Sequence, residues 1–77
     1  MAKIKLYSAP GCVYCIFAKN FLKENNISFE EIDISKSQTI AQNLVKETGQ
    51  FGIPVIKIGS KVIIGFDKDK IKKALEE

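Results

Sequence analysis

The chain has 77 residues, of which 45% are hydrophobic and 27% are charged, and its formal net charge is +3. This balance is typical of a globular protein rather than a disordered or membrane-spanning chain, and the length suits one domain over residues 1–77. The lysines are scattered along the chain rather than clustered, so we expect neither nucleic acid nor a membrane surface as a partner.

The N-terminal residues 1–7 alternate lysine with apolar residues and do not form the apolar run of a signal peptide. No stretch of the chain approaches the roughly 20 apolar residues of a membrane span. We therefore expect the protein in the reducing cytoplasm, where two nearby cysteines serve chemistry more often than structure.

The first half of the chain has the pattern of a strand, a helix and a second strand. Residues 3–7 alternate apolar and polar positions and lead into the turn-forming segment 8–11, which predicts a short strand. Residues 13–23 carry apolar side chains at helical spacing, and residues 27–34 alternate again as a second strand. The apolar positions of this first helix are Tyr14, Phe17, Ala18, Phe21 and Leu22.

A second helix is predicted between two local signals. Ser35 followed by Gln38 matches a capping box at the N-terminus of this helix, and Gly49 matches its C-terminal cap. Residues 40, 41, 44 and 45 form its apolar face.

The last third of the chain predicts a hairpin and a final helix. Residues 54–58 and 61–64 are rich in β-branched side chains, and the Gly59-Ser60 pair between them suits a type II′ turn. Asp67 is a good N-cap for a helix whose inner face holds residues 71, 74 and 75. The predicted fold class is therefore α/β, in the order β-α-β-α-β-β-α, with a mixed four-stranded sheet and three helices.

Cys12 and Cys15 lie where the first strand leads into the first helix. The thiolate is the nucleophile in disulfide exchange, and the N-terminus of a helix stabilises it through unpaired N–H groups and the helix dipole. We therefore expect Cys12 to attack with a pKa below the value of about 8.5 for free cysteine. Cys15 lies nearly one turn further on the same side, where it can resolve a mixed disulfide formed at Cys12.

Three other interpretations of the two cysteines are weaker. A structural zinc site normally takes four Cys or His ligands, and this chain has two cysteines and no histidine, so we expect no metal. A cysteine hydrolase of the papain kind is excluded because it needs a histidine to activate the thiol. Burial of both cysteines as small hydrophobes is disfavoured by their place beside Pro10 and Gly11 in a turn.

Three separated motifs resemble those of the dithiol glutaredoxins, and the resemblance covers essentially the whole chain. Residues 8–15 read SAPGCVYC, residues 52–55 read GIPV, and residues 65–67 read GFD. The resemblance implies the thioredoxin fold and a monomer that reduces protein disulfides and glutathione mixed disulfides. Its partners would be glutathione, as a co-substrate, and disulfide-containing proteins, and it would bind no cofactor tightly.

The resemblance also implies a groove for glutathione. Tyr14 would line this groove, although its ring could equally pack within the protein. The bond between Ile53 and Pro54 would be cis and lie opposite Cys12, so that the Ile53 backbone pairs with the substrate like a short strand. Phe66 and Asp67 would bracket the γ-glutamyl end of glutathione, a role compatible with Asp67 as a helix cap.

The chain departs from the glutaredoxin pattern at basic positions that bind glutathione carboxylates. Ala9 replaces a common Lys or Arg, Gln50 replaces another, and a second glycine and a second acidic residue are missing around Gly65. Loss of these charged contacts weakens glutathione binding.

Two neighbouring groups supply alternative functions. Val13 and the Gly65-Phe66 pair resemble the glutaredoxin-like redoxins that are recharged by thioredoxin reductase and donate electrons to ribonucleotide reductase, whereas Tyr14 is typical of glutaredoxins. A third possibility is an iron–sulfur cluster carrier, although such carriers mostly have a single cysteine followed by Gly-Phe-Ser.

Overall fold

A computed structural model describes residues 3–49 and 52–76. Within these residues one mixed four-stranded sheet is combined with three α-helices and one 3₁₀ turn, which confirms the predicted fold class and element order. In chain order the elements are β1 (Ile4–Ser8), α1 (Val13–Glu24), β2 (Glu30–Asp33), η1 (Ile34–Lys36), α2 (Gln38–Thr48), β3 (Val55–Ile58), β4 (Lys61–Ile64) and α3 (Lys68–Glu76).

The strands lie in the order β2-β1-β3-β4. β1 and β2 are parallel, with Tyr7 opposite Ile32, and β3 is antiparallel to both β1 and β4. The two cysteines follow the carboxyl end of the inner strand β1, so the sheet fixes where helix α1 begins.

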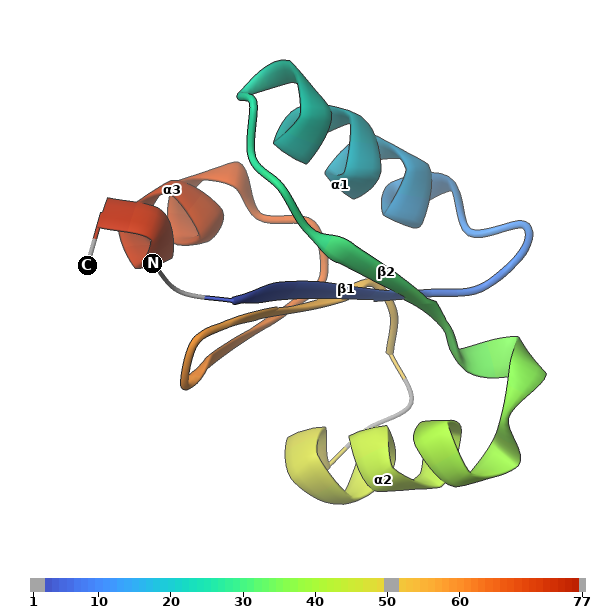
Figure 1. Ribbon diagram of the computed structural model, residues 1–77. Coiled ribbons are helices and arrows are strands. Elements are labelled where there is room, and N and C mark those ends of the chain that lie inside the picture. The colour runs from blue at the N-terminus through green and yellow to red at the C-terminus, as the bar shows by residue number, and fades with distance from the viewer. Residues whose placement is uncertain (1–2, 50–51, 77) are drawn as a thin grey trace.

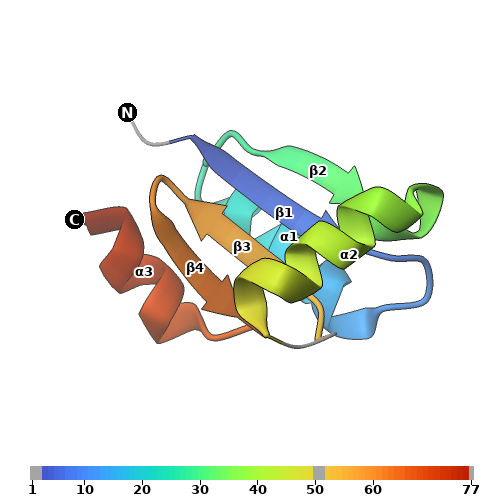
Figure 2. The same cartoon turned by 90° about the horizontal axis from the view of Figure 1, so that it is seen from below.

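The helices divide between the two faces of the sheet. α1 and α3 lie on one face and α2 on the other, as Figures 1 and 2 show. The larger core cluster joins α1 and α3 to the sheet, and Leu6, Leu22, Ile56 and Ile71 in it are fully buried. α2 covers a smaller cluster built from Tyr7, Leu44 and Val55. No helix within the described ranges is long and apolar enough to cross a membrane.

The second strand is shorter than predicted. It runs over Glu30–Asp33 rather than residues 27–34, because its pairing with β1 extends only from Lys5 opposite Glu30 to Ser8 opposite Asp33. Ile27 and Phe29 instead pack against the larger core cluster from the connection that follows α1.

The predicted capping box of the second helix is wrong. The N-cap of α2 is Ser37, whose side-chain oxygen accepts a hydrogen bond from the backbone N–H of Ile40 at 3.3 Å. Ser35 lies in η1, where its backbone N–H and its hydroxyl both donate to the Asp33 carboxylate, at 2.9 and 2.6 Å. Asp33 is therefore the N-cap of η1, and Ser35, which is bonded to it, does not cap α2.

The predicted hairpin and the final helix are confirmed. Gly59 has a positive φ of 61° and Ser60 does not have a positive φ, which fits a type II′ turn rather than type I′. Asp67 caps α3 by accepting a hydrogen bond from the backbone N–H of Lys70 at 3.2 Å. Ile71 on the inner face of α3 is fully buried.

Candidate functional site

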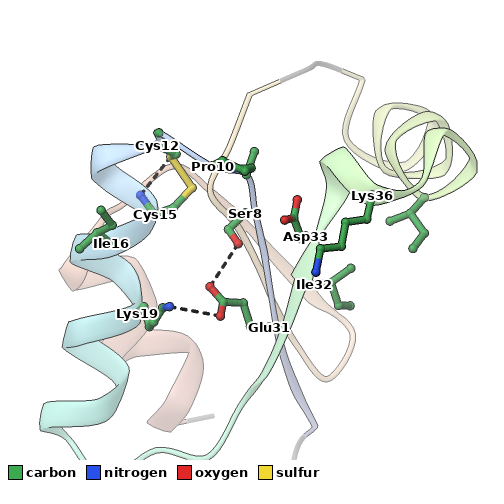
Figure 3. Close-up of a pocket in the computed structure, with 13 residues that line it drawn as sticks. Ser8, Pro10, Cys12, Cys15, Ile16, Lys19, Glu31, Ile32, Asp33 and Lys36 are labelled. Carbon is green, nitrogen blue, oxygen red and sulfur yellow. Dashed lines mark hydrogen bonds and ion pairs between the residues drawn. A yellow bond between two sulfur atoms is a disulfide. The ribbon is translucent and has the colours of Figure 1, made fainter.

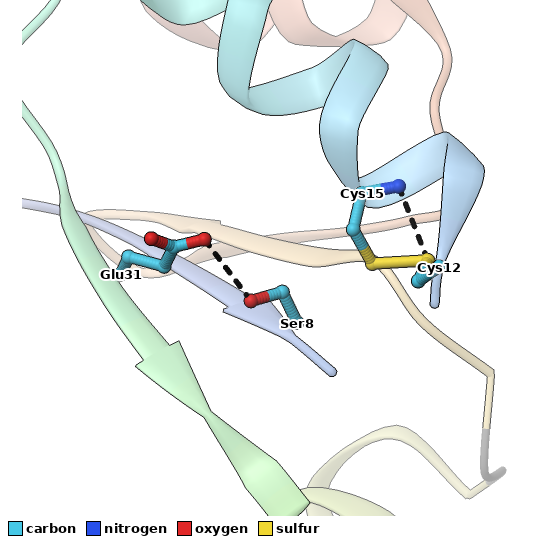
Figure 4. Close-up of a disulfide and its surroundings, with 4 residues drawn as sticks. All are labelled: Ser8, Cys12, Cys15 and Glu31. Atoms are coloured by element: carbon cyan, nitrogen blue, oxygen red, sulfur yellow. Dashed lines mark hydrogen bonds between the residues drawn. A yellow bond between two sulfur atoms is a disulfide. The ribbon is translucent and has the colours of Figure 1, made fainter. Parts of the chain in front are cut away.

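Cys12 and Cys15 form a disulfide at the N-terminus of α1 (Figure 4). Cys12 is the N-cap residue and is partly exposed, with extended backbone angles of φ −87° and ψ 106°. Cys15 lies in the first turn of the helix, and only 4% of its surface is exposed. The two sulfur atoms are therefore bonded to each other but differ in their access to solvent.

The Cys12 sulfur lies at the positive end of helix α1 and accepts a backbone hydrogen bond. The backbone N–H of Cys15 donates a hydrogen bond to Cys12 Sγ at 3.1 Å, and the first turn of α1 contains no acidic side chain. The Cys12 carbonyl already accepts the helical hydrogen bond from Ile16 N–H at 3.3 Å. A thiolate at Cys12 would be stabilised here by the N–H group and the helix dipole.

The peptide bond between Ile53 and Pro54 is cis, as the family resemblance implied. Pro54 is buried, and its carbonyl accepts a hydrogen bond from the Gly65 backbone N–H at 2.7 Å. This hydrogen bond connects the segment before β3 to the turn that carries Phe66 and Asp67. The start of β3 and the end of β4 thus bring four residues to one end of the hairpin, namely Ile53, Pro54, Phe66 and Asp67.

A row of aromatic rings connects the cysteine turn to Phe66. The ring centroids of Tyr14 and Phe17 are 5.9 Å apart, and those of Phe17 and Phe66 are 6.2 Å apart. Tyr14 is 63% exposed and Phe17 is 48% exposed, so these two residues do not belong to the buried face of α1, which holds Ala18, Phe21 and Leu22. The sequence pattern placed Phe17 with the apolar face and missed its contact with Phe66.

The charged groups near the cysteines differ from those of the family pattern. Ala9 lies in the turn after β1 and brings no charge, and Gln50 lies outside the described residues. Lys19, Glu31, Asp33 and Lys36 instead line a cavity beside the disulfide, away from the aromatic row.

This cavity has a volume of about 650 Å³ and is lined by both cysteines, by the turn after β1 and by the end of β2 (Figure 3). Lys19 Nζ lies 3.2 Å from Glu31 Oε1, and the Ser8 hydroxyl donates to Glu31 Oε2 at 3.3 Å. Asp33 and Lys36 form the wall on the β2 side. None of these four charged residues was predicted from the sequence as a site residue. Asp33 and Lys36 could have been, because they lie at or just after the carboxyl end of a strand parallel to β1, where ligands commonly bind.

A redox-active pair at the start of the helix after β1 and a cis-proline before β3 define a dithiol–disulfide protein of the thioredoxin fold. Residues 4–63 match the family model described as glutaredoxin, and the chain belongs to the glutaredoxin family. It is a glutaredoxin-like thiol–disulfide oxidoreductase with a Cys-x-x-Cys pair.

Three similar proteins illustrate the range of this family. An uncharacterised glutaredoxin-like 8.6 kDa protein in the rubredoxin operon of Clostridium pasteurianum is 35% identical, over 96% of this chain and 99% of its own length. The structure of a glutaredoxin from Archaeoglobus fulgidus superimposes with a TM-score of 0.89 at 26% identity, covering 100% of this chain and 89% of that one. The glutaredoxin-like NrdH-redoxin of Escherichia coli, described as having a thioredoxin-like activity profile, superimposes with a TM-score of 0.84 at 27% identity, covering 92% of each chain.

Proposed function

We propose that this protein reduces protein disulfides and glutathione mixed disulfides with Cys12 as the attacking thiolate and Cys15 as the resolving thiol. The observation that carries the proposal is the asymmetry of the pair. Cys12 is partly exposed and its sulfur accepts an N–H hydrogen bond, whereas Cys15 is buried behind it. We assign the reaction to the reducing cytoplasm, where the dithiol can be regenerated.

The reaction moves two electrons from the dithiol to the substrate. The Cys12 thiolate attacks one sulfur of the substrate disulfide, and the other substrate sulfur leaves as a thiolate that takes up a proton. Cys15 then loses its proton and attacks the Cys12 sulfur, which releases the second substrate thiol. The product is the Cys12–Cys15 disulfide found in the structure.

We propose glutathione as the co-substrate that reduces this disulfide again. Tyr14 and Phe66 would provide apolar walls for it, and the Ile53 backbone beside the cis Pro54 would pair with its peptide groups. Asp67 would meet the ammonium of its γ-glutamyl end. The contacts that support this assignment are the aromatic row from Tyr14 to Phe66 and the bond from Gly65 to Pro54.

A second candidate is a redoxin that is recharged by thioredoxin reductase and donates electrons to ribonucleotide reductase. Two observations favour it, namely the uncharged Ala9 in the turn before Cys12 and the likeness to the NrdH-redoxin of Escherichia coli. Without a basic side chain in this turn, a glutathione carboxylate loses one charge-assisted hydrogen bond.

The two candidates are separated by their electron donors. The protein is given insulin as a disulfide substrate, with NADPH, glutathione and glutathione reductase in one reaction and NADPH with thioredoxin reductase in another. Turnover that requires glutathione supports the first proposal, and turnover that requires thioredoxin reductase supports the second. The Cys12→Ser variant is the control for background reduction, and turnover equal to that background with both donors would overturn both proposals.

A further inference from the structure

The cavity beside the disulfide lies where two neighbouring parallel strands lead to helices on opposite faces of the sheet. β1 leads into α1 on one face of the sheet, and the adjacent parallel strand β2 leads through η1 into α2 on the other face (Figures 1 and 2). In open α/β sheets, ligands bind in the crevice at the carboxyl ends of two such strands. The cavity occupies this position, and its volume of about 650 Å³ suits a small molecule.

Two of the four charged groups in the cavity satisfy each other. The Lys19 ammonium and the Glu31 carboxylate form a salt bridge at 3.2 Å, and Glu31 also accepts the hydrogen bond from Ser8. These groups form the floor of the cavity below Cys15 and have little need of a ligand.

Asp33 and Lys36 are different because each keeps capacity for a ligand. Oδ1 of Asp33 accepts both hydrogen bonds from Ser35, and within residues 3–49 and 52–76 no partner is found for Oδ2. Lys36 forms no salt bridge within the same residues. The two groups lie on the same side of the cavity, because Asp33 is the N-cap of η1 and Lys36 is its last residue. The pKa of Asp33 is lowered first by the Ser35 hydroxyl and backbone N–H, and in smaller part by the charge of Lys36.

A carboxylate beside an ammonium matches the zwitterionic end of an amino acid, in which an ammonium and a carboxylate share one carbon. We propose that this cavity binds the amino-acid end of a small disulfide substrate of the cystine class, with its ammonium on Asp33 and its carboxylate on Lys36. The substrate sulfur then faces the cysteine pair, because Cys12 and Cys15 line the other side of the same cavity (Figure 3).

This inference rests on the proposed thiol–disulfide exchange and adds a substrate class to it. The Cys12 thiolate bonds to one sulfur of cystine, and the other half leaves as cysteine after taking up a proton. Cys15 loses its proton and bonds to Cys12, which releases the second cysteine. One cystine is thereby reduced to two cysteines, and the protein dithiol is oxidised to the disulfide.

Binding can be tested apart from chemistry. Cystathionine carries two amino-acid ends but a thioether in place of the disulfide, so it binds without reacting. When it is added to the oxidised protein, we expect the backbone amide signals of Ser8, Ala9, Gly11, Cys12 and residues 33–36 to shift in ¹H–¹⁵N spectra, and those of Tyr14 and Phe66 to stay in place. Shifts confined to the aromatic row, or no shifts at millimolar cystathionine, would overturn the proposal.

The kinetic test uses two variants that remove a charge and keep the shape. In Asp33→Asn the amide oxygen can still accept the Ser35 hydrogen bonds, and Lys36→Gln keeps a polar side chain of similar length. Lys46→Gln, an exposed lysine on α2 away from the cavity, is the matched control. The reduced variants are mixed with cystine or with uncharged bis(2-hydroxyethyl) disulfide, and the loss of protein thiols is followed in a single turnover.

We expect both cavity variants to react about tenfold more slowly with cystine, since each loses one charge-assisted hydrogen bond, and at the wild-type rate with the uncharged disulfide. Equal effects on the two substrates, or no effect on either, would refute the site. Glutathione disulfide is the third substrate because its γ-glutamyl end has the same chemistry; slowing with cystine alone limits the site to cystine-sized ligands, and slowing with both extends it to glutathione. If the wild-type protein reduces none of the three, the proposed function fails, and the cystathionine spectra still decide whether the cavity binds amino acids.

Discussion

The backbone N–H of Cys15 donates a hydrogen bond to the sulfur of Cys12 at 3.1 Å, so the backbone of the buried cysteine holds the sulfur of the partly exposed one. The bond exists because Cys12 is the N-cap of α1, where the first N–H groups have no partner within the helix. A serine or aspartate usually accepts this bond. Here the sulfur accepts it, and in the reduced protein this arrangement favours the thiolate over the thiol.

The first prediction concerns the charge of this sulfur. We expect Cys12 in the reduced protein to titrate with a pKa below the value of about 8.5 for free cysteine, because the N–H group and the helix dipole stabilise its charged form. The measurement is thiolate absorbance at 240 nm as a function of pH, with Cys15→Ser isolating the Cys12 signal. A midpoint at or above the free value would show that the helix N-terminus does not activate this thiol.

The second prediction separates the roles of the two cysteines. Cys15→Ser should still remove glutathione from a mixed disulfide, because that reaction needs only an attack by Cys12, but it should trap a mixed disulfide with a protein substrate. Cys12→Ser should be inactive in both reactions because Cys15 is only 4% exposed. Mass spectrometry of the trapped species checks the assignment. Reduction of a protein disulfide by Cys12→Ser at a rate near that of the wild type would reverse the two roles.

The third prediction concerns the end of α2. Gly49 has a φ of 76°, and its backbone N–H donates to the Val45 carbonyl at 2.7 Å. A Cβ at this position would meet no atom within 4 Å, so substitution by alanine should cost only the backbone strain of about 1–2 kcal/mol. Gly49→Asn should cost less because asparagine adopts this conformation more readily. Urea unfolding measures both, and equal free energies of unfolding for the two variants would contradict this explanation.

The fold could be predicted from the sequence where a local pattern and a tertiary contact agree. Residues 61–64 were predicted as a strand from their β-branched side chains, and Ile63 of this strand enters the core, so the bounds of β4 match the prediction. The predicted strand over residues 27–34 was too long because alternation does not show where the partner strand begins and ends. The helix start was misplaced because Gln38, three residues after Ser35, favours Ser35 as the cap in sequence. The hydrogen bonds from Ser35 to Asp33 and from Ile40 to Ser37 make Ser37 the cap instead.

The candidate site was predictable to the extent that its residues lie together in the sequence. Cys12 and Cys15 share one turn, and their position before a helix was visible from the change of period. The cavity residues Asp33 and Lys36 were missed because they become neighbours of the cysteines only through the pairing of β1 with β2. The contact between Phe17 and Phe66 was missed because it forms only when α1 packs against the turn before α3. Local spacing does not record such contacts.

The last prediction concerns alkaline pH. Lys57 on β3 forms a salt bridge with Glu47 on α2, and its ammonium lies 5.2 Å from the centre of the Tyr7 ring. The Glu47 carboxylate raises the pKa of Lys57 above its ordinary value of 10.5, although partial burial opposes this effect. A pKa that is higher in the folded than in the unfolded protein adds stability that is fully present below about pH 10.5 and is lost as the pH rises through the folded value.

The difference in the free energy of unfolding between the wild type and Glu47→Gln should therefore be constant from pH 7 to 9 and shrink towards zero above pH 11. We expect this difference to stay below about 1 kcal/mol, because the Glu47 side chain is 50% exposed and water screens the pair. Comparison of the two proteins at each pH cancels the pH dependence of stability that they share. Glu76→Gln, an exposed change on α3, is the control and should show no such pH dependence. If the difference in the free energy of unfolding between wild type and Glu47→Gln persists unchanged to pH 12, the charge of Lys57 is not its cause, and the salt bridge does not stabilise the packing of α2 on the sheet.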